Sequence, residues 1–173
     1  MHLFLTGDKG IGKSTALVRY LDTVKVRYQG IRTQIRDDPS GYRYLFGERI
    51  DNRQNPLEHF LLATRTPGGS FQTHQEGFEK NMVRLLSDLS PDCNLIVIDE
   101  LGYLEDEAIA FQERVLSLLD GSRPVLGVLK KHSSLFLGSI ARHHKVTVYE
   151  VNLQNRDQMP AEIASFFSFG TKT

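Results

Sequence analysis

The feature that most constrains this chain is a glycine-rich turn within its first fifteen residues. The apolar residues Leu3 to Leu5 come first and are typical of a short strand. Residues Gly7–Ser14 (GDKGIGKS) then match the phosphate-binding pattern G-x-x-x-x-G-K-[ST]. That pattern has meaning only between a strand and a helix, and the spacing predicts a helix at Thr15–Asp22. The turn therefore predicts an α/β fold whose first strand leads directly into a P-loop.

Each residue type in this turn suits the binding of a phosphate chain. The glycines allow bends that point successive backbone N–H groups at phosphate oxygens, and the positive end of the helix dipole faces the same anion. Lys13 is expected to reach the β- and γ-phosphates, and the Ser14 hydroxyl is expected to bind Mg²⁺. The predicted nucleotide-binding residues of the turn are Gly7, Asp8, Lys9, Gly10, Ile11, Gly12, Lys13, Ser14 and Thr15.

A second landmark is the apolar run Leu95–Ile98, which is followed by Asp99 and Glu100. A continuous apolar run is typical of a strand buried on both faces of a parallel sheet, and ligands gather at the carboxyl end of such strands. We therefore expect Asp99 to hold Mg²⁺ through water. Glu100 is expected to act as the base for an attacking water, with Lys13 as the other catalytic residue. Alternatively, the two acids only satisfy N–H groups of the segment that follows.

The remaining segments alternate between strand and helix patterns, which favours a single domain over residues 1–173 with a mostly parallel central sheet and helices on both faces. A β-hairpin, 29–50, is added to it, with a turn at 37–41. Residues 51–55 are expected to form a loop, and 56–64 is ambiguous between strand and short helix, with strand favoured. Further strands are expected at 94–100, 124–129 and 146–151, and helices at 73–89, 105–119, 133–142 and from 155 onward.

Several arginines in the added hairpin have two interpretations. In the first interpretation, the four arginines form a solvated face of the sheet. In the second, one of them is directed at phosphate, and the pattern does not indicate which one. The four are Arg32, Arg36, Arg43 and Arg49. The segment Arg65–Gly69 could be part of a lid.

Composition narrows the possible partners. Lys plus Arg and Asp plus Glu both number 21, so the chain has none of the basic excess usual in nucleic-acid binders. No apolar run approaches a membrane span, and the apolar start lacks the features of a signal peptide. Cys93 is the only cysteine. We therefore expect a cytoplasmic protein that binds nucleoside triphosphates, with neither a membrane nor a nucleic acid as partner.

Taken together, these motifs resemble the small nucleoside-triphosphatases related to the cancer-related nucleoside-triphosphatase. The likeness covers nearly the whole chain, and its most specific part is the block VIDELGYLE followed some fifty residues later by Asn155-Arg156-Asp157. The resemblance implies a RecA-like P-loop fold and slow, Mg²⁺-dependent hydrolysis of nucleoside triphosphates with broad base selectivity. It also implies that Asp99 and Glu100 form the acidic pair of the site.

Two departures from the family pattern affect the expected site. The family usually has Pro-Pro-Gly where this chain has Asp8-Lys9-Gly10, so the stiffness and charge of the loop differ. The family also tends to have lysine where Tyr103 stands, which leaves a phosphate contact by that lysine in question here.

Three functions remain open from the sequence. The first is triphosphate hydrolysis, the second a small nucleoside or nucleotide kinase on the same fold, and the third a nucleotide-dependent switch. Arg156 has two interpretations as well. It could stack on the nucleobase, because every base has a π-face, or the segment could simply cap the last helix through Asn155.

Overall fold

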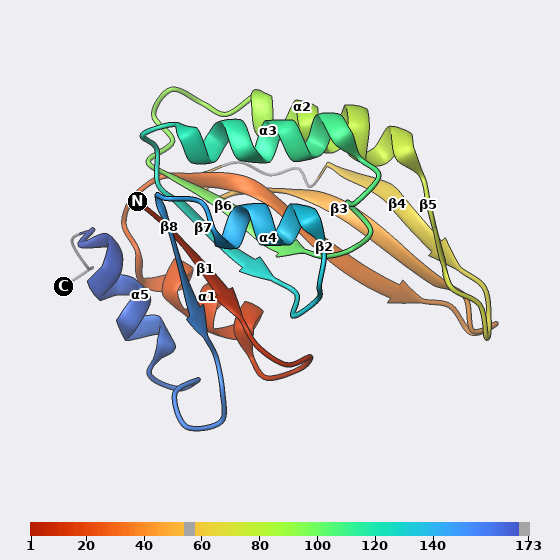
Figure 1. The fold of residues 1–173 in the computed structure, drawn as a ribbon, viewed down its shortest axis with the longest axis horizontal. Helices are drawn as coiled ribbons and strands as arrows, with labels where there is room; N and C mark the ends of the chain where they lie inside the picture. The colour runs from red at the N-terminus through yellow and green to blue at the C-terminus, as the bar shows by residue number, and fades with distance from the viewer. Residues whose placement is uncertain (54–57, 170–173) are drawn as a thin grey trace.

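The computed structural model describes residues 1–53 and 58–169, which form one eight-stranded sheet with helices on both faces (Figure 1). The strand order is β5-β4-β3-β2-β6-β7-β1-β8. None of the helices in these described ranges is long and apolar enough to cross a membrane. The α/β class with a central sheet is confirmed.

Five parallel strands form what we call the parallel half of the sheet. They are β1 (His2–Thr6), β2 (Tyr28–Asp37), β6 (Leu95–Leu101), β7 (Val125–Leu129) and β8 (Val146–Glu150). Strands β1, β6 and β7 lie in the middle of this half, and their apolar residues are buried on both faces. Because parallel strands end at one common edge, the segments after β1, β6 and β7 meet there.

Three strands beyond β2 form the antiparallel extension, namely β3 (Arg43–Asp51), β4 (His59–Arg65) and β5 (Phe71–Thr73). The predicted hairpin is confirmed, since β2 and β3 pair continuously from Gln29↔Asp51 to Asp37↔Arg43. The favoured strand at 56–64 is confirmed from His59 onward. Residues 54–57, where part of the predicted loop and strand falls, lie outside the described residues. Strand β5 was not predicted, because three residues are too few to show alternation.

Helices cover the two faces of the sheet with separate apolar cores. One face carries the π-helical segment Gly77–Met82, α2 (Val83–Ser87), α3 (Ile109–Asp120) and α4 (Leu135–Ala141). The other face carries α1 (Lys13–Thr23) and α5 (Met159–Phe167), and it covers only the parallel half (Figure 1). The predicted helix at 73–89 was therefore right in type, but Thr73 belongs to β5.

The helix predicted at 105–119 begins later, at Ile109, because Glu105 makes other bonds. Its side chain accepts the Gly102 N–H at 2.9 Å, and its carbonyl oxygen accepts the Ala108 N–H. Ile109 does not face the core, although it is apolar, since it is 57% exposed. At 100° per residue, Ile109 lies about 200° from Phe111, which begins the buried stripe of α3.

The last helix also starts later than predicted, and its cap is not Asn155. The Asn155 side chain instead accepts the Asn152 N–H and donates to the Glu150 carbonyl oxygen, so it closes the turn that follows β8. Gln158 occupies the cap position of α5. The interpretation of Asn155 as a helix cap was therefore wrong.

Candidate active site

The P-loop connects β1 to α1, and its glycines adopt the backbone conformation that the pattern requires. Gly10 and Gly12 have φ of 76° and 109°, in the left-handed region that favours glycine. Gly12 ends the turn, and the Ala16 N–H donates to its carbonyl oxygen, so α1 begins at Lys13 rather than at the predicted Thr15. The first turn of α1 thus points its free N–H groups into the loop.

Lys13 is held at the mouth of the loop. Its side chain is only 7% exposed, and its Nζ donates to the carbonyl oxygens of Gly7 and Asp8, each at 3.0 Å. The same Nζ lies 3.8 Å from Glu100 Oε2. The ammonium thus lies against the backbone of the loop that is expected to hold a phosphate chain.

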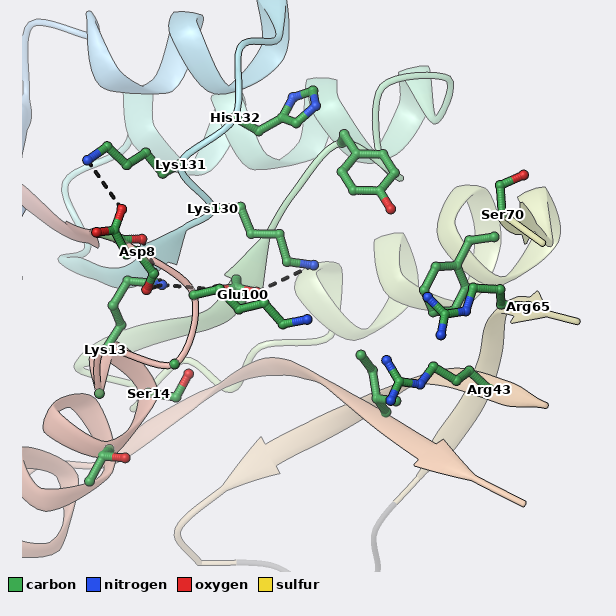
Figure 2. Close-up of a pocket in the computed structure, with 18 of the residues that line it drawn as sticks. Asp8, Lys13, Ser14, Arg43, Arg65, Ser70, Glu100, Lys130, Lys131 and His132 are labelled. Carbon is green, nitrogen blue, oxygen red and sulfur yellow. Dashed lines mark hydrogen bonds and ion pairs between the residues drawn. The ribbon is translucent and has the colours of Figure 1, made fainter. Parts of the chain in front are cut away.

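Glu100 lies between two lysines at the end of β6. Its Oε1 lies 3.4 Å from the Nζ of Lys130, which follows β7, and its Oε2 faces Lys13 (Figure 2). The carboxylate is thus fixed from both sides and is still partly exposed. Two ammonium groups and one carboxylate within a few ångströms favour the binding of a further negative charge.

Ser14 and Asp99, which are both expected to hold Mg²⁺, lie next to each other. The Ser14 hydroxyl donates to Asp99 Oδ1 at 2.7 Å. Burial raises the pKa of the Asp99 carboxyl above its usual value, although the hydrogen bond from Ser14 acts in the opposite direction. A hydroxyl and a partly buried carboxylate are oxygen ligands of the kind that Mg²⁺ takes beside phosphates, so these residues fit that ion.

The P-loop opens into a cavity of about 700 Å³. Although the chain as a whole has no net charge, six cationic side chains and only two carboxylates line this cavity. The cations are Lys9, Lys13, Arg43, Arg65, Lys130 and Lys131, and the carboxylates are Asp8 and Glu100. The cavity is therefore a place for an anionic ligand, which composition could not reveal.

The structure brings most of the predicted site residues together. Seven P-loop residues and Thr15 line the cavity, and Asp99 lies behind it, bonded to Ser14. Ile11 does not line the cavity but packs against the core beside α1. Arg156 is exposed on the turn after β8 and is not among the cavity residues either.

The structure separates the hairpin arginines that pair with glutamates from the one that lines the cavity. Arg32 and Arg36 both pair with the buried Glu48, and Arg49 pairs with Glu58. Only Arg43, of these four, lines the cavity. The cavity also includes Arg65 and Gly69 of the segment suggested as a lid.

Lys130 and Lys131 were missed, because consecutive lysines after an apolar strand resemble an ordinary solvated loop. Their position at the carboxyl end of β7 was the available signal. Lys131 lies 3.4 Å from Asp8 and 2.9 Å from Glu150, so it offsets the charge that Asp8 adds to the loop. Lys130 lies 6.0 Å from the ring centre of Tyr103, so a lysine does stand beside the place where the family has one.

Comparisons with known proteins identify a family along nearly the whole chain. The model of the NTPase family matches residues 2–164. The nucleoside-triphosphatase THEP1 of Methanosarcina barkeri is 34% identical, with 96% of this chain and 97% of that protein covered. The THEP1 of Thermotoga petrophila is 30% identical over 98% of this chain and 94% of that protein.

Two solved structures share the fold. The crystal structure of THEP1 from Aquifex aeolicus has a TM-score of 0.74 at 19% identity and covers 96% of this chain and 98% of its own. The solution structure of a human cancer-related nucleoside triphosphatase has a TM-score of 0.69 at 23% identity, with 99% of each chain covered. With its P-loop, its acidic pair and a family match along nearly its whole length, the chain belongs to the NTPase family of nucleoside-triphosphatases.

Proposed function

We propose that this protein hydrolyses nucleoside 5′-triphosphates to diphosphates and phosphate, with Mg²⁺ as cofactor and Glu100 as the residue that activates water. The observation that carries the proposal is the position of Glu100 between Lys13 and Lys130, at the mouth of the P-loop. A carboxylate there faces the γ-phosphate end of a bound triphosphate, because the lysine of a P-loop reaches the β- and γ-phosphates.

In the proposed reaction, a water oxygen attacks the γ-phosphorus and the bond to the β–γ bridging oxygen breaks. Glu100 accepts the proton that the water loses. Lys13 and Lys130 stabilise the charge that develops on the phosphoryl oxygens and on the leaving diphosphate. Ser14 and Asp99 would hold Mg²⁺, which neutralises charge on the phosphates when it is bound.

The test is phosphate release from ATP, GTP, CTP and UTP, with and without Mg²⁺ and without any acceptor. Release from all four triphosphates supports a hydrolase of broad base selectivity. Transfer of the γ-phosphoryl group to an added acceptor, without release of free phosphate, would indicate a kinase. A slow rate that one partner protein accelerates strongly would indicate a switch.

Glu100→Gln tests the assigned base. The substitution keeps the size of the side chain but removes its charge and most of its basicity, so kcat should fall by about 10²–10⁴-fold. Nucleotide affinity should change little, because Lys13, Ser14 and the loop amides remain. The matched control is Glu113→Gln on the exposed side of α3. Hydrolysis within a few-fold of the unmodified protein would mean that another group is the base.

A contact between Arg156 and the nucleobase stays a prediction. It lies on the turn between β8 and α5, on the same edge of the sheet as the P-loop, and its exposed guanidinium could stack on any base. Arg156→Ala should raise KM for all four triphosphates. An unchanged KM for every triphosphate would remove Arg156 from the site.

A further inference from the structure

The cavity continues beyond the P-loop. Lys13 and Ser14 mark its P-loop end, and Glu100 and Lys130 stand at its middle (Figure 2). Arg43, Arg65 and Ser70 lie on the far side of Glu100, away from the loop (Figure 2). A cavity of about 700 Å³ is large enough for a whole small molecule, and a phosphate chain in the P-loop would fill only its inner end.

The far wall is a single row of side chains across the antiparallel extension. The register pairs Asp37 with Arg43, Arg43 with Arg65, and Arg65 with Phe71. Directly paired residues of neighbouring antiparallel strands lie on the same face of the sheet. The pairing thus sets two guanidinium groups side by side on the cavity face, next to an aromatic ring.

The charges of this row are not balanced. Like charges directly opposite each other across a sheet are destabilising. Asp37 accepts two hydrogen bonds from Arg43, at 2.8 and 3.0 Å, and so offsets one of the two arginines. Arg65 Nε is buried and has no hydrogen-bond partner among the residues that the structure describes. An N–H donor in this state suits an anion that would lie against it.

The same wall also offers apolar and aromatic surface. The Arg65 guanidinium carbon lies 5.5 Å from the ring centre of Phe71. Ile35, 49% exposed, and Tyr103, 43% exposed, also line the cavity. Planar rings stack on such surfaces, whereas a phosphate ion makes no favourable contact with them.

We propose that this outer part of the cavity is a second binding subsite, which takes a nucleoside monophosphate while a triphosphate occupies the P-loop. Arg43 and Arg65 bind its phosphate, and its base lies against Phe71, Ile35 and Tyr103. The proposal rests on the proposed function only in that the triphosphate binds with its γ-phosphate toward Glu100. It adds a ligand on the side from which the attacking group approaches.

The experiment measures binding of UMP to the full chain saturated with Mg²⁺ and a non-hydrolysable ATP analogue. UMP should bind at one site per chain. Ribose 5-phosphate, which lacks the base, and uridine, which lacks the phosphate, should each bind roughly ten- to a hundred-fold more weakly. Displacement of UMP by the ATP analogue would place it in the P-loop and overturn the proposal.

Variants then locate the subsite. Arg65→Ala and Arg43→Ala should each weaken UMP binding about ten- to a hundred-fold, because each removes charge-assisted hydrogen bonds to the phosphate. Arg65→Lys keeps the charge and should lose less. The matched control is Arg36→Ala, which comes from the opposite face of the same sheet and leaves Arg32 on Glu48. UMP binding that both cavity variants leave intact, or that Arg36→Ala weakens equally, would overturn the proposal.

The two proposals fail separately. Phosphate release from ATP alone measures hydrolysis, and UMP binding is measured with an analogue that is not hydrolysed. A protein that hydrolyses ATP but does not bind UMP refutes only the second subsite. A protein that binds UMP but releases no phosphate refutes only the hydrolase.

Discussion

The parallel half and the antiparallel extension contribute to the same cavity in different ways. The parallel half is covered by helices on both faces, and its site residues lie at the end of β6 and in the segments that follow β1 and β7. The extension has helices on one face, and it contributes through side chains that stand on the strands themselves. The site residues of the parallel half can therefore be found from sequence motifs, whereas those of the antiparallel extension depend on the register of its strands.

The largest expected effect comes from removing the P-loop lysine, Lys13. Lys13→Ala loses the group that bonds to the Gly7 and Asp8 carbonyl oxygens and faces Glu100. Phosphate release should fall by about 10³-fold, and triphosphate affinity should weaken as well. The control is Lys80→Ala, an exposed lysine that pairs with Glu76. Activity near that of the unmodified protein would contradict the site assignment.

A second prediction tests the joint between the two regions. Gly30 lies on β2, which pairs with β6 on one side and β3 on the other. A Cβ at Gly30 would lie 1.9 Å from the Val97 carbonyl oxygen, and the residue has φ of 158°. Because the obstacle is backbone of a buried strand, Gly30→Ala should lower the free energy of unfolding by about 4 kcal/mol or more.

Gly68→Ala is the matched comparison for Gly30. Gly68 has φ of 72° in the turn between β4 and β5, and a Cβ there would meet nothing within 4 Å. Only backbone strain remains, so the loss should be about 1–2 kcal/mol. Urea denaturation measures both variants. Equal losses would mean that the joint is no more constrained than an outer turn.

The third prediction concerns Glu105, which lies in the segment between β6 and α3. Burial raises the pKa of this carboxyl to about 7. Because the folded state then favours the protonated form, its contribution to stability is present below about pH 4.5 and is lost as the pH rises through 7. Glu105→Gln, which cannot ionise, should be more stable than the unmodified protein by about 3 kcal/mol at pH 8.

The measurement is urea denaturation of both proteins at pH 4.5 and pH 8. The stability difference should nearly vanish at the lower pH, because Glu105 is protonated in the folded state and already about half protonated in the unfolded chain there. A difference that does not change with pH would show that the substitution acts through packing instead.

The smallest effect is expected at the opposite edge of the parallel half. His2 is buried, with Nδ1 accepting the Val125 N–H and Nε2 bonded to the Leu119 carbonyl oxygen. Burial lowers the pKa of His2 to about 4. The folded state favours neutral His2, so its contribution is full above about pH 6.5 and is lost as the pH falls toward 4.

The Glu105→Gln background isolates the His2 effect, because ionisation of Glu105 would act in the opposite direction over the same range. In that background the free energy of unfolding should fall by about 2 kcal/mol between pH 6.5 and pH 5. NMR titration of the His2 ring gives an independent check. A ring that titrates near pH 6.5 in the folded protein would contradict the prediction.

The sequence by itself determined the features that follow from local pattern. Gly7–Ser14 and the apolar run before Asp99 each carry their own signal, because a P-loop and a buried parallel strand are continuous in the chain. Their meeting could be predicted as well, since parallel strands end at a common edge. The contact between Ser14 and Asp99 followed from that rule.

Only the tertiary structure decided the outer part of the cavity. Arg43 and Arg65 stand beside Phe71 through the pairing of β3, β4 and β5, and a shift of one residue would turn each side chain to the other face. Lys130 reaches Glu100 because β7 happens to lie next to β6 in the sheet. Register and strand order depend on packing between distant segments, so no local pattern in the chain records them.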